Sequence, residues 1–165
     1  MADKAATAWA LLRIALGWIF FWPFLDKTFG LGFRTPHDGA WIRGGHPTRG
    51  FLNGADGWFK DVYHAMADVA LVEWLFMLGL LLIGLSLIFG IGVRIACYSG
   101  IAMMTLMYLA EVGFRKGVAT NPFMDEHVVY ALALLGLSFV HAGRRLGLGS
   151  WWARQPVVQK HPMLE

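Results

Sequence analysis

Two glutamates of this chain stand inside apolar stretches, which is unusual for a carboxylate. Glu73 and Glu111 each have an apolar residue on both sides. A carboxylate in such a setting faces a protein interior and finds a partner there, because an unpaired charge in apolar surroundings is costly. His127 is a candidate partner, since imidazoles titrate near neutral pH and exchange protons. Glu73, Glu111 and His127 are therefore the candidate catalytic residues for proton transfer, with a structural hydrogen bond as the alternative.

Other polar residues stand near these three in the expected helices. Tyr108 follows a three–four helical spacing with Cys97 and Glu111, so the three share one helix face. Packing is the alternative for that face, because cysteine is an ordinary filler of apolar interiors. Asp26 and Lys27 directly follow an apolar run, and they are equally consistent with a site and with a solvated helix end.

No metal site is expected from the sequence. The histidines of the first loop match no usual ligand spacing, and the single cysteine excludes both an intrachain disulfide and a site made of cysteines alone. The sequence also lacks a phosphate loop, a dinucleotide fingerprint and a haem-attachment motif. Its basic residues form no stripe of the kind that binds nucleic acid, so no nucleic-acid partner is expected.

The composition is that of an integral-membrane protein in contact with lipid. Hydrophobic residues make up 57% of the chain, and the mean hydropathy is +0.52. A soluble domain of 165 residues has too little interior to hide so much apolar surface. The run from Trp9 to Leu25 holds one charge, Arg13, and at about 1.5 Å per residue it approaches the hydrocarbon thickness of a bilayer. We expect Arg13 to reach for lipid phosphate, with pairing inside the protein as the alternative.

Four apolar stretches predict four membrane helices, in an all-α integral-membrane four-helix bundle with both termini on one side. The expected helices cover residues 9–26, 69–89, 94–112 and 125–142 of a single membrane domain, 1–165. The first is expected to remain uncleaved, because the small-residue pattern of a signal-peptide cleavage site is absent. Asp125 or Asn121 is expected to cap the fourth.

The extramembrane parts are a long loop, 27–68, and a polar tail, 143–165. Apolar residues at helical spacing after Asp56 predict a short amphipathic helix within the loop. Arg144 and Arg145 favour a cytoplasmic C-terminus. In an up-down bundle the candidate polar residues then lie at one depth, on the face that the loop covers.

Several stretches resemble the DoxX/DoxD family of small four-helix membrane proteins. They are the run LLRIALGWIFFWPFLDKTFGLGF, the loop AWIRGGHPTRGFL, and a glycine-punctuated span that follows Glu73 and ends in GIGVR. The resemblance covers roughly residues 11–141. The loop is similar to that of DoxD-like members, among them the small subunit of thiosulfate:quinone oxidoreductase, although this chain has Gly44-Gly45-His46-Pro47-Thr48 where members often have Gly-Gly-Ser-Pro-Thr.

The resemblance implies an oxidoreductase subunit that works beside electron transfer to a quinone in a prokaryotic plasma membrane. A partner subunit or a homo-oligomer is implied with it. The quinone ring would pack on Trp22, Trp74 and Tyr108, with Asp26 and Lys27 beside it, and Glu73, Glu111 or His127 would take up protons. Two alternatives remain: a non-catalytic membrane subunit that assembles or anchors a larger complex, and a small permease. Catalysis by this chain alone is not established by its residues.

Overall fold

The computed structural model describes residues 2–111 and 123–164, and within these ranges the chain is helical and has no strand. The four longest helices are α1 (Ala2–Phe29), α4 (Ala70–Phe89), α5 (Val93–Glu111) and α6 (Glu126–Ser138). The shorter elements are η1 (His37–Gly39), η2 (Trp41–Arg43), α2 (Arg49–Gly54), α3 (Lys60–Met66), η3 (Ala142–Arg144), α7 (Gly149–Trp152), α8 (Pro156–Lys160) and η4 (Pro162–Leu164).

Three of the described helices are long and apolar enough to cross a membrane: residues Lys4–Phe29 of α1, and the whole of α4 and α5. The α4 helix leaves Leu71, Leu75 and Leu82 about three-fifths exposed or more, at 66%, 61% and 60%. A contiguous exposed apolar surface of this kind promotes aggregation in water, whereas lipid tails can cover it. The prediction of a helical protein with apolar helices of membrane-spanning length is confirmed. The fourth expected span is shorter than predicted, since α6 ends at Ser138 rather than near 142.

The first helix is longer than the predicted range 9–26 and passes through Pro23. It begins at Ala2 because the stretch before Trp9 is rich in alanine, the best helix former. Proline removes one backbone donor but does not end the helix here. The helix ends at Phe29 and is followed by Gly30, whose φ of 64° is left-handed and whose N–H donates to the carbonyl of Asp26 at 2.8 Å.

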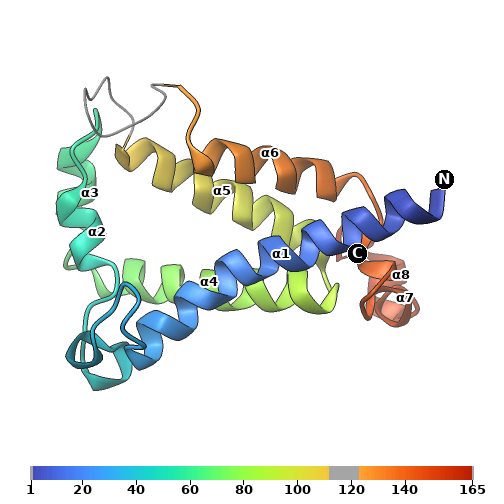
Figure 1. Cartoon of the computed structure of the whole chain (residues 1–165), viewed down its shortest axis with the longest axis horizontal. Helices are drawn as coiled ribbons and strands as arrows, with labels where there is room; N and C mark the ends of the chain where they lie inside the picture. Colours follow the sequence, from blue (N-terminus) through green and yellow to red (C-terminus); the bar gives the residue numbers. More distant parts are fainter. Residues whose placement is uncertain (1, 112–122, 165) are drawn as a thin grey trace.

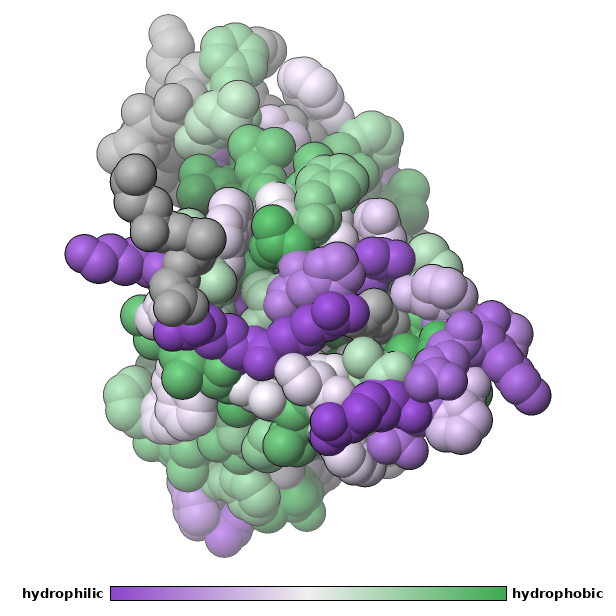
Figure 2. Space-filling model, turned by 90° about the vertical axis from the view of Figure 1, so that its right-hand side faces the viewer, coloured by the Kyte–Doolittle hydropathy of each residue, from purple (hydrophilic) through white to green (hydrophobic). Residues whose placement is uncertain are grey.

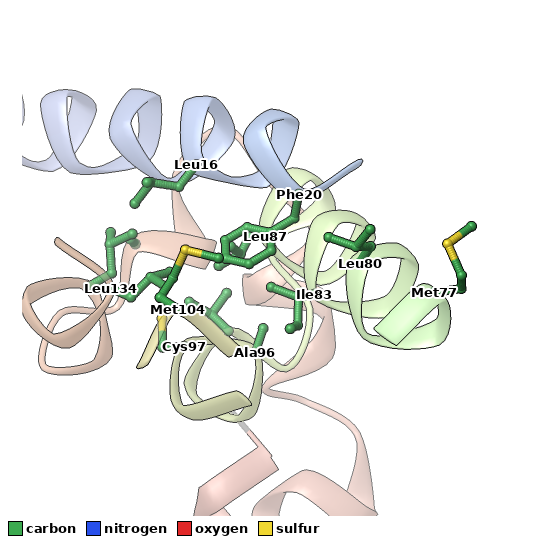
Figure 3. Close-up of a cluster of buried hydrophobic side chains, with 13 residues drawn as sticks. Leu16, Phe20, Met77, Leu80, Ile83, Leu87, Ala96, Cys97, Met104 and Leu134 are labelled. Carbon is green, nitrogen blue, oxygen red and sulfur yellow. The ribbon is translucent and has the colours of Figure 1, made fainter. Parts of the chain in front are cut away.

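The long helices pack as two pairs, α1 with α4 and α5 with α6, and the contact between α4 and α5 joins the pairs. In Figure 1, α1 runs obliquely across α4, while α5 and α6 lie along each other. Side chains of all four helices meet in one apolar core, and Figure 3 shows Leu16 and Phe20 of α1 pointing toward the other three helices. The other labelled members are Met77, Leu80, Ile83, Leu87, Ala96, Cys97, Met104 and Leu134.

Glycines allow α1 and α4 to approach closely. A Cβ at Gly84 would lie 2.8 Å from the backbone nitrogen of Phe21, and one at Gly17 would lie 2.9 Å from the backbone nitrogen of Ile88. Small residues at a helix contact serve this purpose in membrane proteins, where close packing replaces the hydrophobic effect as the driving force.

Arg13 is fully buried, and it joins α1 to the end of α4. Its Nη1 donates to the carbonyls of Leu87 and Ile88 at 2.6 and 3.2 Å, and its Nη2 donates to Leu146 at 2.7 Å. The expectation that Arg13 reaches lipid phosphate is therefore wrong, and its alternative, pairing inside the protein, is confirmed. The physical reason is that the last carbonyls of a helix have no donor of their own and carry partial negative charge.

Each of the last four backbone carbonyls of α4 accepts a hydrogen bond, either from Arg13 or from a backbone N–H. Ser86 accepts from the N–H groups of Gly90 and Ile91, and Phe89 accepts from Leu148 at 2.8 Å, while Arg13 serves the two carbonyls between them. The segment after α6 is thereby fixed to the end of α4, and α7 and α8 lie at the end of the molecule where α1 begins (Figure 1). Whether that end is cytoplasmic stays a prediction.

The amphipathic helix expected in the first loop is α3, and α2 precedes it. These two short helices pack on the end of α5 through Leu52, Tyr63 and Ala110. The hydroxyl of Tyr63 donates to the carbonyl of Leu106 at 2.6 Å. On the apolar face on which the prediction rested, Trp58 and Val62 are exposed, whereas Met66 packs against this cluster.

Candidate functional site

Glu73 lies in the first turn of α4, and two residues of the first loop hold its carboxylate. Trp41 Nε1 donates to Oε1 at 2.8 Å, and His46 Nδ1 lies 3.2 Å from Oε2. The Glu73 side chain is 13% exposed, whereas that of His46 is 50% exposed. The Glu73 carboxylate thus has little direct contact with water, but it contacts the imidazole of His46, which is exposed to water. We call Trp41, His46, Glu73 and Trp74 the Glu73 cluster.

The glycines of the loop explain how Trp41 and His46 reach one carboxylate. Gly44 ends η2 with a φ of 87°, a left-handed conformation that favours glycine. Gly45 passes so close to Gly39 that a Cβ would lie 2.1 Å from the Gly39 carbonyl oxygen. The chain therefore reverses tightly between the two side chains, and both point to the same acceptor.

Aromatic rings border this carboxylate. The rings of Trp41 and Trp74 are 4.6 Å apart between centroids and meet edge-on at 66°. Aromatic pairs prefer such an arrangement over a face-to-face sandwich. Trp74 is 54% exposed, so part of its surface is open for a further contact.

Asp26 is almost fully buried, at 3% exposed, and holds the start of the loop. Its carboxylate accepts N–H bonds from Phe33 at 3.2 Å and from Arg34 and Thr35 at 3.0 Å. The interpretation of Asp26 as a solvated helix end is therefore wrong. It stabilises the backbone that follows α1, which is a structural role and leaves little of the carboxylate for a ligand.

Lys27 and Trp22, the other two candidates near the end of α1, also contact the loop. Lys27 Nζ donates to the carbonyl of Pro47 at 3.3 Å, one residue from His46. Trp22 packs edge-on against Phe33 with ring centroids 5.0 Å apart. Both residues support the loop that delivers Trp41 and His46.

Glu111, Asp125 and His127 form a second group, the His127 cluster, where α5 ends and α6 begins. One ligand atom from each lies within 4.8 Å of the others. Asp125 caps α6 as predicted, since its Oδ1 accepts from the N–H of Val128 at 3.1 Å, and its Oδ2 lies 2.7 Å from His127 Nδ1. An imidazole with two carboxylates is a donor set that suits a divalent transition metal. Asp125 was not among the sequence candidates for such a role.

The structure thus places the three predicted catalytic residues in two clusters, with Glu73 in one and Glu111 and His127 in the other. The polar partners of Glu73 are Trp41 and His46, and that of His127 is Asp125. Tyr108 lies close to the second cluster, with its hydroxyl donating to the carbonyl of Phe123 at 3.3 Å. In Figure 1, α4 begins and α5 ends on the same side of the molecule but at opposite edges of it, and α2 and α3 lie between these edges.

Comparisons with protein-family models, with curated proteins and with solved structures found no match for this chain. The resemblance to the DoxX/DoxD family stays a prediction from the sequence.

Proposed function

We propose that this chain is a DoxX/DoxD-like integral-membrane subunit that takes part in electron transfer to a quinone, with the Glu73 cluster at the quinone headgroup. In this proposal α6 is a fourth membrane segment that completes a bundle with α1, α4 and α5. Both termini are cytoplasmic, in a prokaryotic plasma membrane. A partner subunit supplies the electrons, as in the oxidation of two thiosulfates to tetrathionate.

The observation that carries the proposal is the bonding of the Glu73 carboxylate to both Trp41 and His46 at the start of a membrane span. Reduction of a quinone to a quinol consumes two electrons and two protons, so the headgroup needs a proton donor in reach. Half-exposed His46 can pass protons from water to Glu73, which is itself shielded. The exposed part of Trp74 offers an apolar surface to the quinone ring.

A second candidate function is a non-catalytic role in assembling a larger membrane complex. It is favoured by a row of aromatic rings on α1, where Trp18 stacks on Trp22 at 5.8 Å and is itself 51% exposed. Tryptophan is enriched in protein interfaces, and such a row can dock a partner helix as readily as it can contact lipid.

The test is purification from the native membrane in a mild detergent, with identification of the bound quinone and of the co-purifying chains. The rate of quinone reduction is then compared for the wild type, Glu73→Gln and His46→Ala. General acid–base groups contribute about a hundredfold or more, so each variant should lose about that factor. Glu126→Gln is the matched control, because Glu126 is an exposed carboxylate in the first turn of α6.

Three outcomes overturn the proposal. An unchanged rate of quinone reduction in Glu73→Gln would show that the Glu73 cluster is not the headgroup site. Loss of activity in His127→Ala but not in Glu73→Gln moves the site to the His127 cluster. A stoichiometric partner without any bound quinone favours the assembly role instead.

A further inference from the structure

A pocket lies at the end of the molecule opposite the Glu73 cluster, between the α4–α5 turn, the end of α6 and the segment with η3 and α7. It is a small depression open to solvent, with a cavity volume of about 20 Å³. Its polar lining consists of Arg94, Ser138, His141, Arg144 and Trp152. Leu137 and Val140 form an apolar wall beside these groups. Neither proton transfer at Glu73 nor the His127 cluster makes use of this pocket.

The backbone segments that form the pocket are closely packed at their glycines. A Cβ on Gly143 would lie 2.5 Å from the Gly90 carbonyl oxygen, and one on Gly149 would lie 2.4 Å from the Gly143 carbonyl carbon. Arg13 lies directly beneath, since a Cβ on Gly90 would meet its Nη1 at 2.5 Å. The glycines and the Arg13 hydrogen bonds thus fix the segment that carries His141 and Arg144, and the pocket is preformed.

Positive charge predominates in the C-terminal stretch at this end. From residue 128 to residue 165 the sequence contains four basic residues, Arg144, Arg145, Arg154 and Lys160, and one acidic residue, Glu165. Figure 2, which looks at this end, shows hydrophilic side chains gathered in a band across it, with hydrophobic ones on both sides. Such a surface attracts anions.

Apolar side chains beside the basic ones place this surface at a membrane boundary. Leu146, Leu148, Trp151 and Val157 are each about half exposed. Tryptophan and aliphatic residues next to arginine and lysine are typical of segments that lie at the headgroup level of a bilayer. Gly90, which follows α4, and Val93 and Arg94, which begin α5, line the pocket, so it lies at the ends of two candidate membrane spans.

We propose that this pocket binds the phosphate-bearing headgroup of an anionic phospholipid. Arg94 and Arg144 bind the phosphate, and His141 adds a hydrogen bond. Arg94 donates to the carbonyl of Pro162 at 3.2 Å, and its guanidinium has further donors. The apolar wall receives the start of the acyl chains. Basic pockets between membrane helices recognise anionic headgroups by this chemistry.

The test compares the lipids that the purified full-length chain retains from mixed micelles of phosphatidylglycerol and phosphatidylcholine, as measured by native mass spectrometry. We expect preferential retention of phosphatidylglycerol. The double variant Arg94→Gln/Arg144→Gln should retain it about thirtyfold less well, since each basic residue near a lipid surface contributes a factor of about five. The control is Arg34→Gln/Arg43→Gln, which removes the same charge from exposed positions of the first loop.

A parallel arm uses inorganic phosphate as the probe and follows the thermal unfolding of the wild type. Stabilisation by phosphatidylglycerol but not by inorganic phosphate supports a lipid site. Equal stabilisation by both overturns it in favour of a free-phosphate site. Equal retention of the two lipids by the wild type also overturns the proposal, and this comparison requires no variant to fold. Equal loss in the control double variant would show that net charge alone is responsible.

Discussion

The guanidinium of Arg13 donates a 2.6 Å hydrogen bond to the carbonyl of Leu87, which lies 74 positions further along the sequence. Through its other bonds the same side chain reaches Leu146, beyond α6. One cation in the first helix therefore supplies the donors that the end of α4 lacks, and it also ties down the segment after α6. A buried arginine without a carboxylate is tolerated here because carbonyl dipoles of a helix C-terminus surround it.

Replacing Arg13 by methionine should destabilise the protein by about 3 kcal/mol, because the carbonyls of Leu87 and Leu146 would be buried without a donor. The measurement is reversible unfolding in mixed micelles with increasing dodecyl sulfate. Arg43→Met is the matched control, since Arg43 is exposed. Equal stability of the two variants would contradict the proposed role of Arg13.

Replacing Gly84 by alanine should cost about 1–3 kcal/mol of unfolding free energy, because the new methyl group would meet the backbone of Phe21 at 2.8 Å. The helices α1 and α4 would have to separate to admit it. Gly54→Ala is the control, since a Cβ there meets nothing within 4 Å. If the Gly84→Ala variant is as stable as this control, the helices α1 and α4 can separate at little cost in free energy.

Tyr63 should make stability fall at high pH. Burial raises the pKa of Tyr63 above its usual value of 10.0. The unfolded chain then ionises this phenol first, so the stability is fully present below pH 10 and is lost as pH rises toward the higher pKa of the folded state. Unfolding measured at pH 9 and pH 11 should show this loss.

Tyr63→Phe provides the comparison for the pH series. It removes the hydrogen bond to Leu106 and lowers stability by about 1 kcal/mol at neutral pH. It should also show a smaller loss of stability between pH 9 and pH 11 than the wild type. An identical loss in both proteins would mean that other groups account for it.

The sequence predicts the helical class and the long apolar helices well, because run length and hydropathy are local properties. It predicts less well where helices end. The prediction ended the first helix at residue 26, but the helix continues to Phe29. Arg13 could not be placed from the sequence, because its acceptors belong to residues more than seventy positions away.

The partners of the candidate site residues were harder to predict than the residues themselves. Glu73 was singled out by its apolar neighbours, but its bonds to Trp41 and His46 depend on how Gly44 and Gly45 turn the loop. For His127 the local signal was present in the spacing Asp125-x-His127, which places both groups at the start of one helix. The prediction favoured a distant partner over this near one.

The unequal lengths of α1 and α6 have a consequence for the surrounding lipid. At about 1.5 Å per residue, the 28 residues of α1 extend about 42 Å, whereas the 13 residues of α6 extend about 20 Å. A hydrocarbon layer of about 30 Å is shorter than the first and thicker than the second. The polar ends of α1 can extend beyond that layer, but with α6 as a membrane segment the bilayer has to thin beside α6. This hydrophobic mismatch would draw short-chain lipids to one flank of the protein and favour its residence in thin membranes.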